Sequence, residues 1–108
     1  MSKKKQKEIQ NMFLEIKNSI THLEQRIDVL EHEKNERELN RLREKLIYNY
    51  RYYANEIKNP MLAWSEMERE SFFKLLKDYN SLGGNDFIHE TVQPAMEKLN
   101  LGKDVILE

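Results

Sequence analysis

The sequence predicts an all-α protein in which a long N-terminal helix of the coiled-coil type is followed by a small helical C-terminal module. Three observations support this fold class. The 108 residues include only three Gly and two Pro, all of them after residue 59, so the first half contains no helix breaker. Charged residues make up 34% of the chain, which is typical of long helices surrounded by water. Apolar residues recur at helical spacing over most of the chain.

The first apolar pattern covers residues 9–30, where the spacing alternates between four and three positions. This is the heptad spacing of a coiled coil, in which positions a and d of each seven-residue repeat form a seam between helices. Position a is taken by Phe13, Ile20 and Ile27, and position d by Ile9, Ile16, Leu23 and Leu30. The stripe is narrow and too long for the rest of this small chain to cover, so we expect it to join copies of the protein. The alternative is an ordinary amphipathic helix packed on its own core.

The seam residues favour a homo-oligomer, and a dimer in particular. Ile at position a with Leu at position d favours two parallel strands, whereas Ile at the d positions nearer to the N-terminus leans toward three. Arg26 at position g and Glu31 at the following e position can pair between parallel chains. Such pairs contribute only on the order of tenths of a kcal/mol.

Residues 31–38 contain no apolar side chain, and a second stripe begins after them. This stripe consists of Leu39, Leu42, Leu46, Tyr50, Tyr53 and Ile57. The step from Leu30 to Leu39 is about two and a half helical turns, which places the second stripe on the opposite side of the helix. Either a continuous helix changes its buried face here, or the chain turns near Asn35 into a helical hairpin. The absence of Gly, Pro and strong capping residues favours the continuous helix.

Pro60 and Ser65 mark the next boundary. Pro60 disfavours helical geometry in the residue before it and cannot extend the hydrogen-bond ladder, so the sequence "KNP" at 58–60 is expected to end the long helix. Ser65, followed three residues later by Glu68, has the pattern of a capping box. These two signals predict that the next helix covers about residues 66–82.

Gly83 and Pro94 divide the rest of the chain. Gly83 can adopt the left-handed conformation that ends a helix. A third helix is expected over residues 86–100, with Asn85 or Asp86 as its cap. Pro94 suits a first turn better than an interior, so it is expected to kink or restart this helix.

The predicted elements group into three segments. Residues 1–38 contain a basic arm and the coiled-coil helix, and residues 39–102 form the helical module. Residues 103–108 form a tail, whose apolar patch Val105-Ile106-Leu107 is expected either to dock on the module or to contact a partner.

The segment "YNYRYY", residues 48–53, divides into two faces of one helix. Tyr50 and Tyr53 share the phase of Leu42 and Leu46, so they are expected in the core. The outer face contains Arg37, Arg41, Lys45, Tyr48 and Tyr52. Tyrosine and arginine dominate protein interfaces, and aromatic rings among cations also bind single-stranded nucleic acid. A protein interface is favoured over nucleic acid, and a plain solvated face, partly neutralised by Glu38 and Glu44, remains the other interpretation.

The composition argues against catalysis and against a cofactor. The chain has no Cys, and its three histidines, His22, His32 and His89, are scattered rather than placed as convergent metal ligands. No apolar run is long enough to span a membrane. A net charge of −1 also lacks the basic footprint of a dedicated nucleic-acid binder. We therefore expect no enzyme, no cofactor and no metal.

One box carries a resemblance to known proteins. The box consists of Tyr79, Leu82, Gly83, Gly84 and Asn85 in the pattern Tyr-x-x-Leu-Gly-Gly-Asn, with Leu46, Ile47, Tyr50 and Tyr53 upstream. With these residues, the segment 44–100 resembles small, helical and often coiled-coil proteins of phages and prophages of Gram-positive bacteria. Many of those proteins have Gly after the Asn, where this chain has Asp86.

The resemblance implies origin and shape more than activity. Together with the seam, it leads us to expect a non-enzymatic phage or prophage protein that self-associates and binds another protein, as a small virion or assembly component or an adaptor. Such a protein would be found in the host bacterial cytoplasm or in the virion. The alternatives are a phage-encoded inhibitor of a host protein and a nucleic-acid-binding accessory protein.

Overall fold

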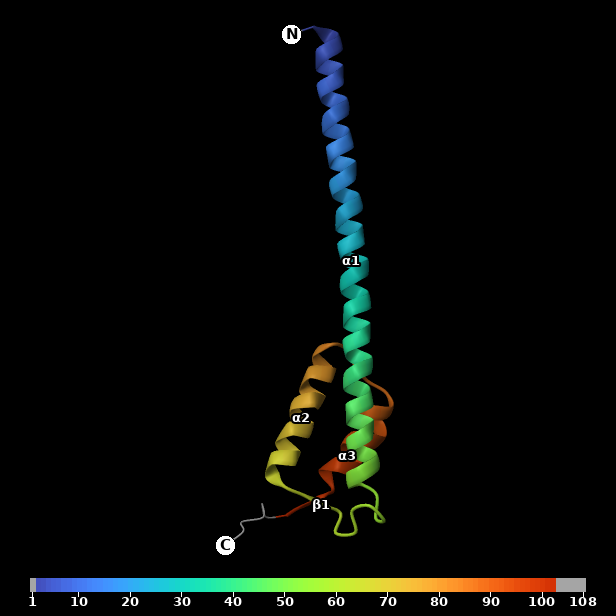
Figure 1. The fold of residues 1–108 in the computed structure, drawn as a ribbon, viewed down its shortest axis with the longest axis vertical. Helices are drawn as coiled ribbons and strands as arrows, with labels where there is room; N and C mark the ends of the chain where they lie inside the picture. The colour runs from blue at the N-terminus through green and yellow to red at the C-terminus, as the bar shows by residue number, and fades with distance from the viewer. Residues whose placement is uncertain (1, 103–108) are drawn as a thin grey trace. The chain divides into compact units, whose positions relative to one another are not determined.

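A computed structural model of the chain describes residues 2–102. Helix α1 (Lys3–Tyr53) comes first and is followed by α2 (Glu66–Ser81) (Figure 1). A π-helical segment, η1 (Ile88–Val92), leads directly into the short helix α3 (Gln93–Glu97). The predicted fold class, a long N-terminal helix followed by a small helical module, is therefore confirmed.

Helix α1 continues through residues 31–38 without interruption, so the helical hairpin near Asn35 is wrong. The internal contacts of the chain nevertheless divide it into two units, with the division between Asn35 and Glu36. Each unit is described separately below.

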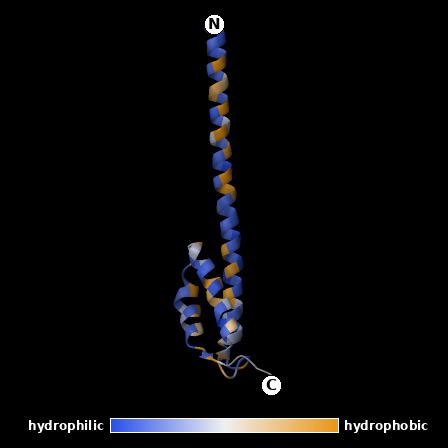
Figure 2. Ribbon diagram, turned by 90° about the vertical axis from the view of Figure 1, so that its left-hand side faces the viewer, coloured by the Kyte–Doolittle hydropathy of each residue, from blue (hydrophilic) through white to orange (hydrophobic). Residues whose placement is uncertain are grey.

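In the first unit, every described residue is exposed, including all seven residues of the heptad seam. Figure 2 shows hydrophobic residues recurring between hydrophilic ones along this part of α1 (Figure 2). Since a helix is usually stabilised by packing its apolar stripe, this part of α1 presents an apolar surface that the described chain leaves open to solvent.

The second unit has a hydrophobic core to which α1, α2, η1, α3 and Trp64 contribute. Figure 1 shows α2 lying beside the C-terminal part of α1. The buried side chains are Leu42 and Leu46 of α1, Trp64, then Phe72, Leu76 and Tyr79 of α2, Ile88 and Val92 of η1, and Met96 of α3. Trp64 lies at the centre of an aromatic group, with its ring centroid 5.6 Å from that of Phe72 and 5.8 Å from that of Tyr53.

Helix α1 ends at Tyr53, earlier than the sequence predicted, because a side chain competes with the helix for backbone groups. The Asn55 carbonyl oxygen Oδ1 accepts hydrogen bonds from the backbone N–H groups of Ile57 (2.8 Å) and Lys58 (3.1 Å). Ile57 therefore lies outside the helix and is 90% exposed, so its predicted place in the second stripe is wrong. Pro60 does not end the helix either, since it lies in the turns that follow.

Helix α2 begins and ends with the predicted devices. The Ser65 hydroxyl accepts a hydrogen bond from the Glu68 N–H (3.1 Å), and the Glu68 carboxylate accepts one from the Ser65 N–H (2.9 Å). At the other end, Gly83 has φ +81°, and the N–H groups of Gly83 and Gly84 donate to the Asn80 and Tyr79 carbonyls. This is the Schellman arrangement, so both signals are confirmed.

The single third helix predicted over 86–100 is wrong in detail. The segment begins as the π-helical η1, and no side chain caps it. Pro94 cannot donate to the carbonyl of Glu90, and its ring would clash there, which the wider π turn relieves. Pro94 then occupies the first turn of α3, so the expected restart is confirmed.

The described part of the second unit also contains two short strands that were not predicted. Strand β1 (Ala63–Trp64) pairs in parallel with β2 (Asn100–Leu101). The Asn100 N–H donates to the Leu62 carbonyl and the Gly102 N–H to the Trp64 carbonyl, both at 2.8 Å. This pairing takes Asn100 out of the predicted helix. The predicted tail, residues 103–108, lies outside the described residues.

Candidate functional site

The heptad seam is the first candidate surface. Its seven apolar side chains have exposed fractions between 40% at Ile9 and 70% at Phe13. They occupy the a and d positions over three heptads of a helix that is continuous in this region. The described chain therefore presents the predicted seam on its surface, uncovered.

The tyrosine cluster divides as its helical phase predicted. Tyr50 and Tyr53 are half-buried and pack against the core of the second unit. Tyr48 is 74% exposed and Tyr52 is 46% exposed. The outer pair is thus accessible, although the Tyr52 ring also packs edge-on against Tyr53 at 5.0 Å between centroids.

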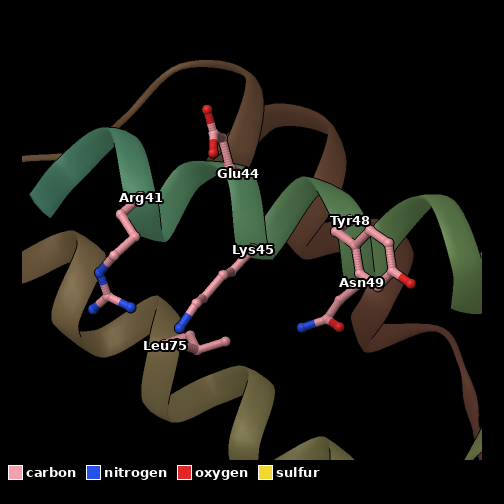
Figure 3. Close-up of a pocket in the computed structure, with 6 residues that line it drawn as sticks. All are labelled: Arg41, Glu44, Lys45, Tyr48, Asn49 and Leu75. Atoms are coloured by element: carbon pink, nitrogen blue, oxygen red, sulfur yellow. The ribbon is translucent and has the colours of Figure 1, made fainter. Parts of the chain in front are cut away.

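A groove lies between α1 and α2 within the second unit. The hollow at its Arg41 end has a volume of about 490 Å³. The residues that line it are Arg41, Glu44, Lys45, Tyr48 and Asn49 of α1, with Leu75 of α2. Figure 3 shows the side chains of Arg41, Lys45 and Asn49 directed toward α2, and the carboxylate of Glu44 directed away from it (Figure 3).

Two smaller hollows continue this groove along the same pair of helices. One is lined by Tyr48, Asn49, Tyr52, Tyr53 and Glu68. The other is lined by Asn49, Tyr53, Met67, Glu68 and Ser71. Because Asn49 contributes to all three hollows, we treat them as one surface and call it the α1–α2 groove.

The two ends of the groove differ in their electrostatics. At one end, Arg41 donates to Glu38, with Nε 3.0 Å from Oε2, and this hydrogen bond raises the pKa of the guanidinium. At the other end, the Tyr53 hydroxyl donates to the Glu68 carboxylate. Burial, together with this hydrogen bond, raises the pKa of Tyr53 to about 12.

Glu68 keeps its negative charge at neutral pH. Partial burial opposes its ionisation, but hydrogen bonds from Tyr53 and from Ser65 outweigh that effect and lower the pKa of the carboxyl group. The groove therefore has cations at the Arg41 end and a carboxylate that is already hydrogen-bonded at the other.

Four of the five residues predicted for the outer face contribute to this groove: Arg41, Lys45, Tyr48 and Tyr52. Arg37 is exposed and does not line it. Sequence reasoning missed Asn49 and Leu75. The spacing of Arg41, Lys45 and Asn49, four residues apart on one helix, could have indicated the first. Leu75 could not be found without the position of α2.

The Tyr-x-x-Leu-Gly-Gly-Asn box is a structural device in this chain. The buried Tyr79 hydroxyl donates to the Asn85 carbonyl (3.1 Å), which holds the loop against the end of α2. A Cβ atom at Gly84 would lie 2.3 Å from the Tyr79 ring, so this position accepts only glycine unless the ring shifts. The box thus explains the turn after α2.

Residues 2–102 contain no group of three His, Cys, Asp or Glu side chains that could hold a metal ion. In the same part of the chain, none of the helices combines the length and the apolar character that a membrane span needs. Comparison with protein-family models, with curated proteins and with solved structures finds no match for this chain. Its function must therefore be inferred from its own residues, and the two surfaces that stand out are the heptad seam and the α1–α2 groove.

Proposed function

We propose that this is a non-enzymatic interaction protein that self-associates through residues 9–30 and uses its helical module to bind another protein. The observation that supports it is the heptad seam, whose seven apolar residues are all exposed in the single chain. Fully burying one such side chain is worth about 1.5–3 kcal/mol before the loss of conformational entropy. The free energy therefore falls when a partner covers a surface of this kind.

A second copy of the chain is the partner that fits the seam best. The alternation of four and three residues is the spacing at which side chains of one helix insert between those of an identical helix. Arg26 and Glu31 flank the seam at positions g and e, where they attract each other across a parallel pair. A parallel dimer satisfies both features.

The resemblance in residues 44–100 supports a phage or prophage origin for the protein. Within that setting we propose a small component of the virion or of its assembly, or an adaptor. If the protein is absent from purified virions and captures a specific host protein in infected cells, it is instead an inhibitor of that host protein. Its presence among the proteins of purified virions would support the structural role.

Self-association can be tested with a charge introduced into the seam. The double variant Ile20→Asp, Ile27→Asp places carboxylates at two a positions, and we expect it to be monomeric in light scattering at micromolar concentration. The matched control is Asn18→Asp, Gln25→Asp, which adds the same charge at the f positions, opposite the seam, and should remain oligomeric like the original chain. A monomeric original chain, or equal behaviour of the two variants, would contradict the proposal.

A further inference from the structure

A row of hydrogen-bond donors lies along one wall of the α1–α2 groove. Arg41, Lys45 and Asn49 follow one another at intervals of four residues and point toward α2 (Figure 3). The guanidinium and ammonium groups only donate, and the Asn amide offers two N–H donors and one acceptor. Within residues 2–102, the side chains of Lys45 and Asn49 form no hydrogen bond or ion pair. Arg41 is paired with Glu38 through two of its guanidinium nitrogens. The donors left for a ligand rich in acceptors are therefore Lys45, Asn49 and the remaining N–H groups of Arg41.

The opposite wall of the groove combines the apolar Leu75 and Met67 with the polar Glu68 and Ser71, and the rim is aromatic. Leu75 faces the row of donors from α2, and Met67 lines the groove further along the same helix. The exposed rings of Tyr48 and Tyr52 border it on the α1 side. A ligand that fills the groove must therefore combine negative charge with apolar side chains, and rigid aromatic residues beside cations are common in protein-binding surfaces.

The carboxylate of Glu68 favours a peptide over a nucleic acid as the ligand of the groove. A single-stranded nucleic acid carries a negative charge on every nucleotide, so a backbone that follows the groove from Arg41 would approach the ionised Glu68. A peptide can place its acidic residues beside Arg41 and Lys45 only. Its apolar residues can then lie at the Glu68 end, beside Met67.

We infer that the α1–α2 groove binds a short acidic segment of another protein. Its carboxylates pair with Arg41 and Lys45, its main chain bonds to the amide of Asn49, and its apolar side chains pack on Leu75 and Met67. The stretch of α1 from Arg41 to Tyr53 is about 18 Å long, which matches roughly five or six residues of extended chain. The inference rests on the proposal that the module binds a partner protein, but it does not require self-association.

The test is an NMR titration of the full-length protein with the peptide Asp-Glu-Asp-Leu-Leu-Leu, whose acidic and apolar residues lie at opposite ends. We expect saturable shifts in the side-chain amide signal of Asn49 and in the backbone amides around Lys45. The peptide Asn-Gln-Asn-Leu-Leu-Leu, which has the same shape without the side-chain charges, and single-stranded oligothymidylate should shift these signals little. Stronger binding of the oligothymidylate would replace the inference with nucleic-acid recognition.

Two variants with the same charge change show whether the groove is the site. Arg41→Glu reverses a charge at the groove, and Arg43→Glu reverses one on the same helix at an exposed position that does not line it. We expect Arg41→Glu to reduce the affinity for the acidic peptide by about five- to tenfold, and Arg43→Glu to leave this affinity nearly unchanged. Equal effects of the two variants, or shifts that avoid Asn49, would overturn the inference.

Light scattering on the same samples separates this inference from the proposed function. A dimer that ignores the acidic peptide would refute the groove as an acidic-peptide site and leave self-association intact. A monomer whose Asn49 signal responds to the peptide would refute the seam and support the groove.

Discussion

The same residue type has opposite environments in the two parts of α1. Leu23 and Leu30 of the first unit are each 57% exposed, whereas Leu42 and Leu46 of the second are 1% and 0% exposed. All four belong to apolar stripes at helical spacing. An apolar stripe therefore marks a helix face that needs a covering surface, but it does not identify that surface. In the second unit the covering surface is formed by α2, η1 and α3. In the first unit we propose that a second copy of the chain forms it.

The largest expected difference in unfolding free energy is between two variants that each shorten one leucine, one in each region. Leu46→Ala should leave a cavity in the core and destabilise the module by about 2–5 kcal/mol, because its neighbours cannot fully close the gap. Leu23→Ala should leave the module's stability unchanged. Urea unfolding followed by the fluorescence of Trp64, the one tryptophan of the chain and a core residue, measures both. If Leu23→Ala shifts the Trp64 transition as much as Leu46→Ala, the two regions are not independent.

The two glycines after α2 provide a second pair of variants, both within the module. Gly84→Ala should cost about 3 kcal/mol, since the new Cβ would overlap the buried Tyr79 ring. Gly83→Ala meets open space and should cost only about 1 kcal/mol, from the left-handed backbone at φ +81°. Both variants should keep the association state of the original chain in light scattering. A larger loss of stability for Gly83→Ala would show that the backbone conformation, and not the ring contact, fixes this turn.

The smallest expected effect concerns the hydrogen bond between Tyr53 and Glu68. The pKa of Tyr53 is raised from 10.0 to about 12 in the folded protein, so its neutral form stabilises the fold below pH 10, and that contribution is lost as the pH rises to about 12. Tyr53→Phe should cost about 1 kcal/mol at neutral pH and make the loss of stability over this alkaline range shallower.

Urea unfolding at a series of pH values measures this effect, with Tyr52→Phe as the control. Tyr52 is the neighbouring tyrosine, and its hydroxyl forms no hydrogen bond within residues 2–102. Identical pH profiles for the two variants would contradict the role given to Tyr53.

Glu68 gives the fold a pH dependence at the acidic end. Because the pKa of Glu68 is lowered in the folded protein, its ionised carboxylate stabilises the fold at pH values above 4.5, the pKa in the unfolded chain. This contribution is lost as the pH falls through the lower pKa of the folded state.

Local signals in the sequence were sufficient for some elements of the fold. The capping box at Ser65 and the left-handed Gly83 involve only residues a few positions apart, so their geometry follows from the residues themselves. The division of the tyrosines into inner and outer faces likewise follows from the period of one helix.

Other features depend on contacts that no local pattern encodes. Asn55 competes with the backbone ladder and ends α1 before Pro60, which the apolar stripe through Ile57 concealed. The β1–β2 pairing joins segments from distant parts of the chain, and strands of two residues show no alternation. The groove needs the position of α2 as well as the face of α1, so only its α1 wall could be foreseen.

The pairing of β1 with β2 has a consequence for the order in which the module folds. It joins Ala63 to Asn100, so the intervening chain with α2, η1 and α3 forms a closed loop. Closing such a loop reduces chain entropy, and the reduction is compensated only once the enclosed helices pack. We therefore expect this bridge to form late in folding. The amide protons of Asn100 and Gly102 should then exchange with solvent at a rate that reports the opening of the loop as a whole.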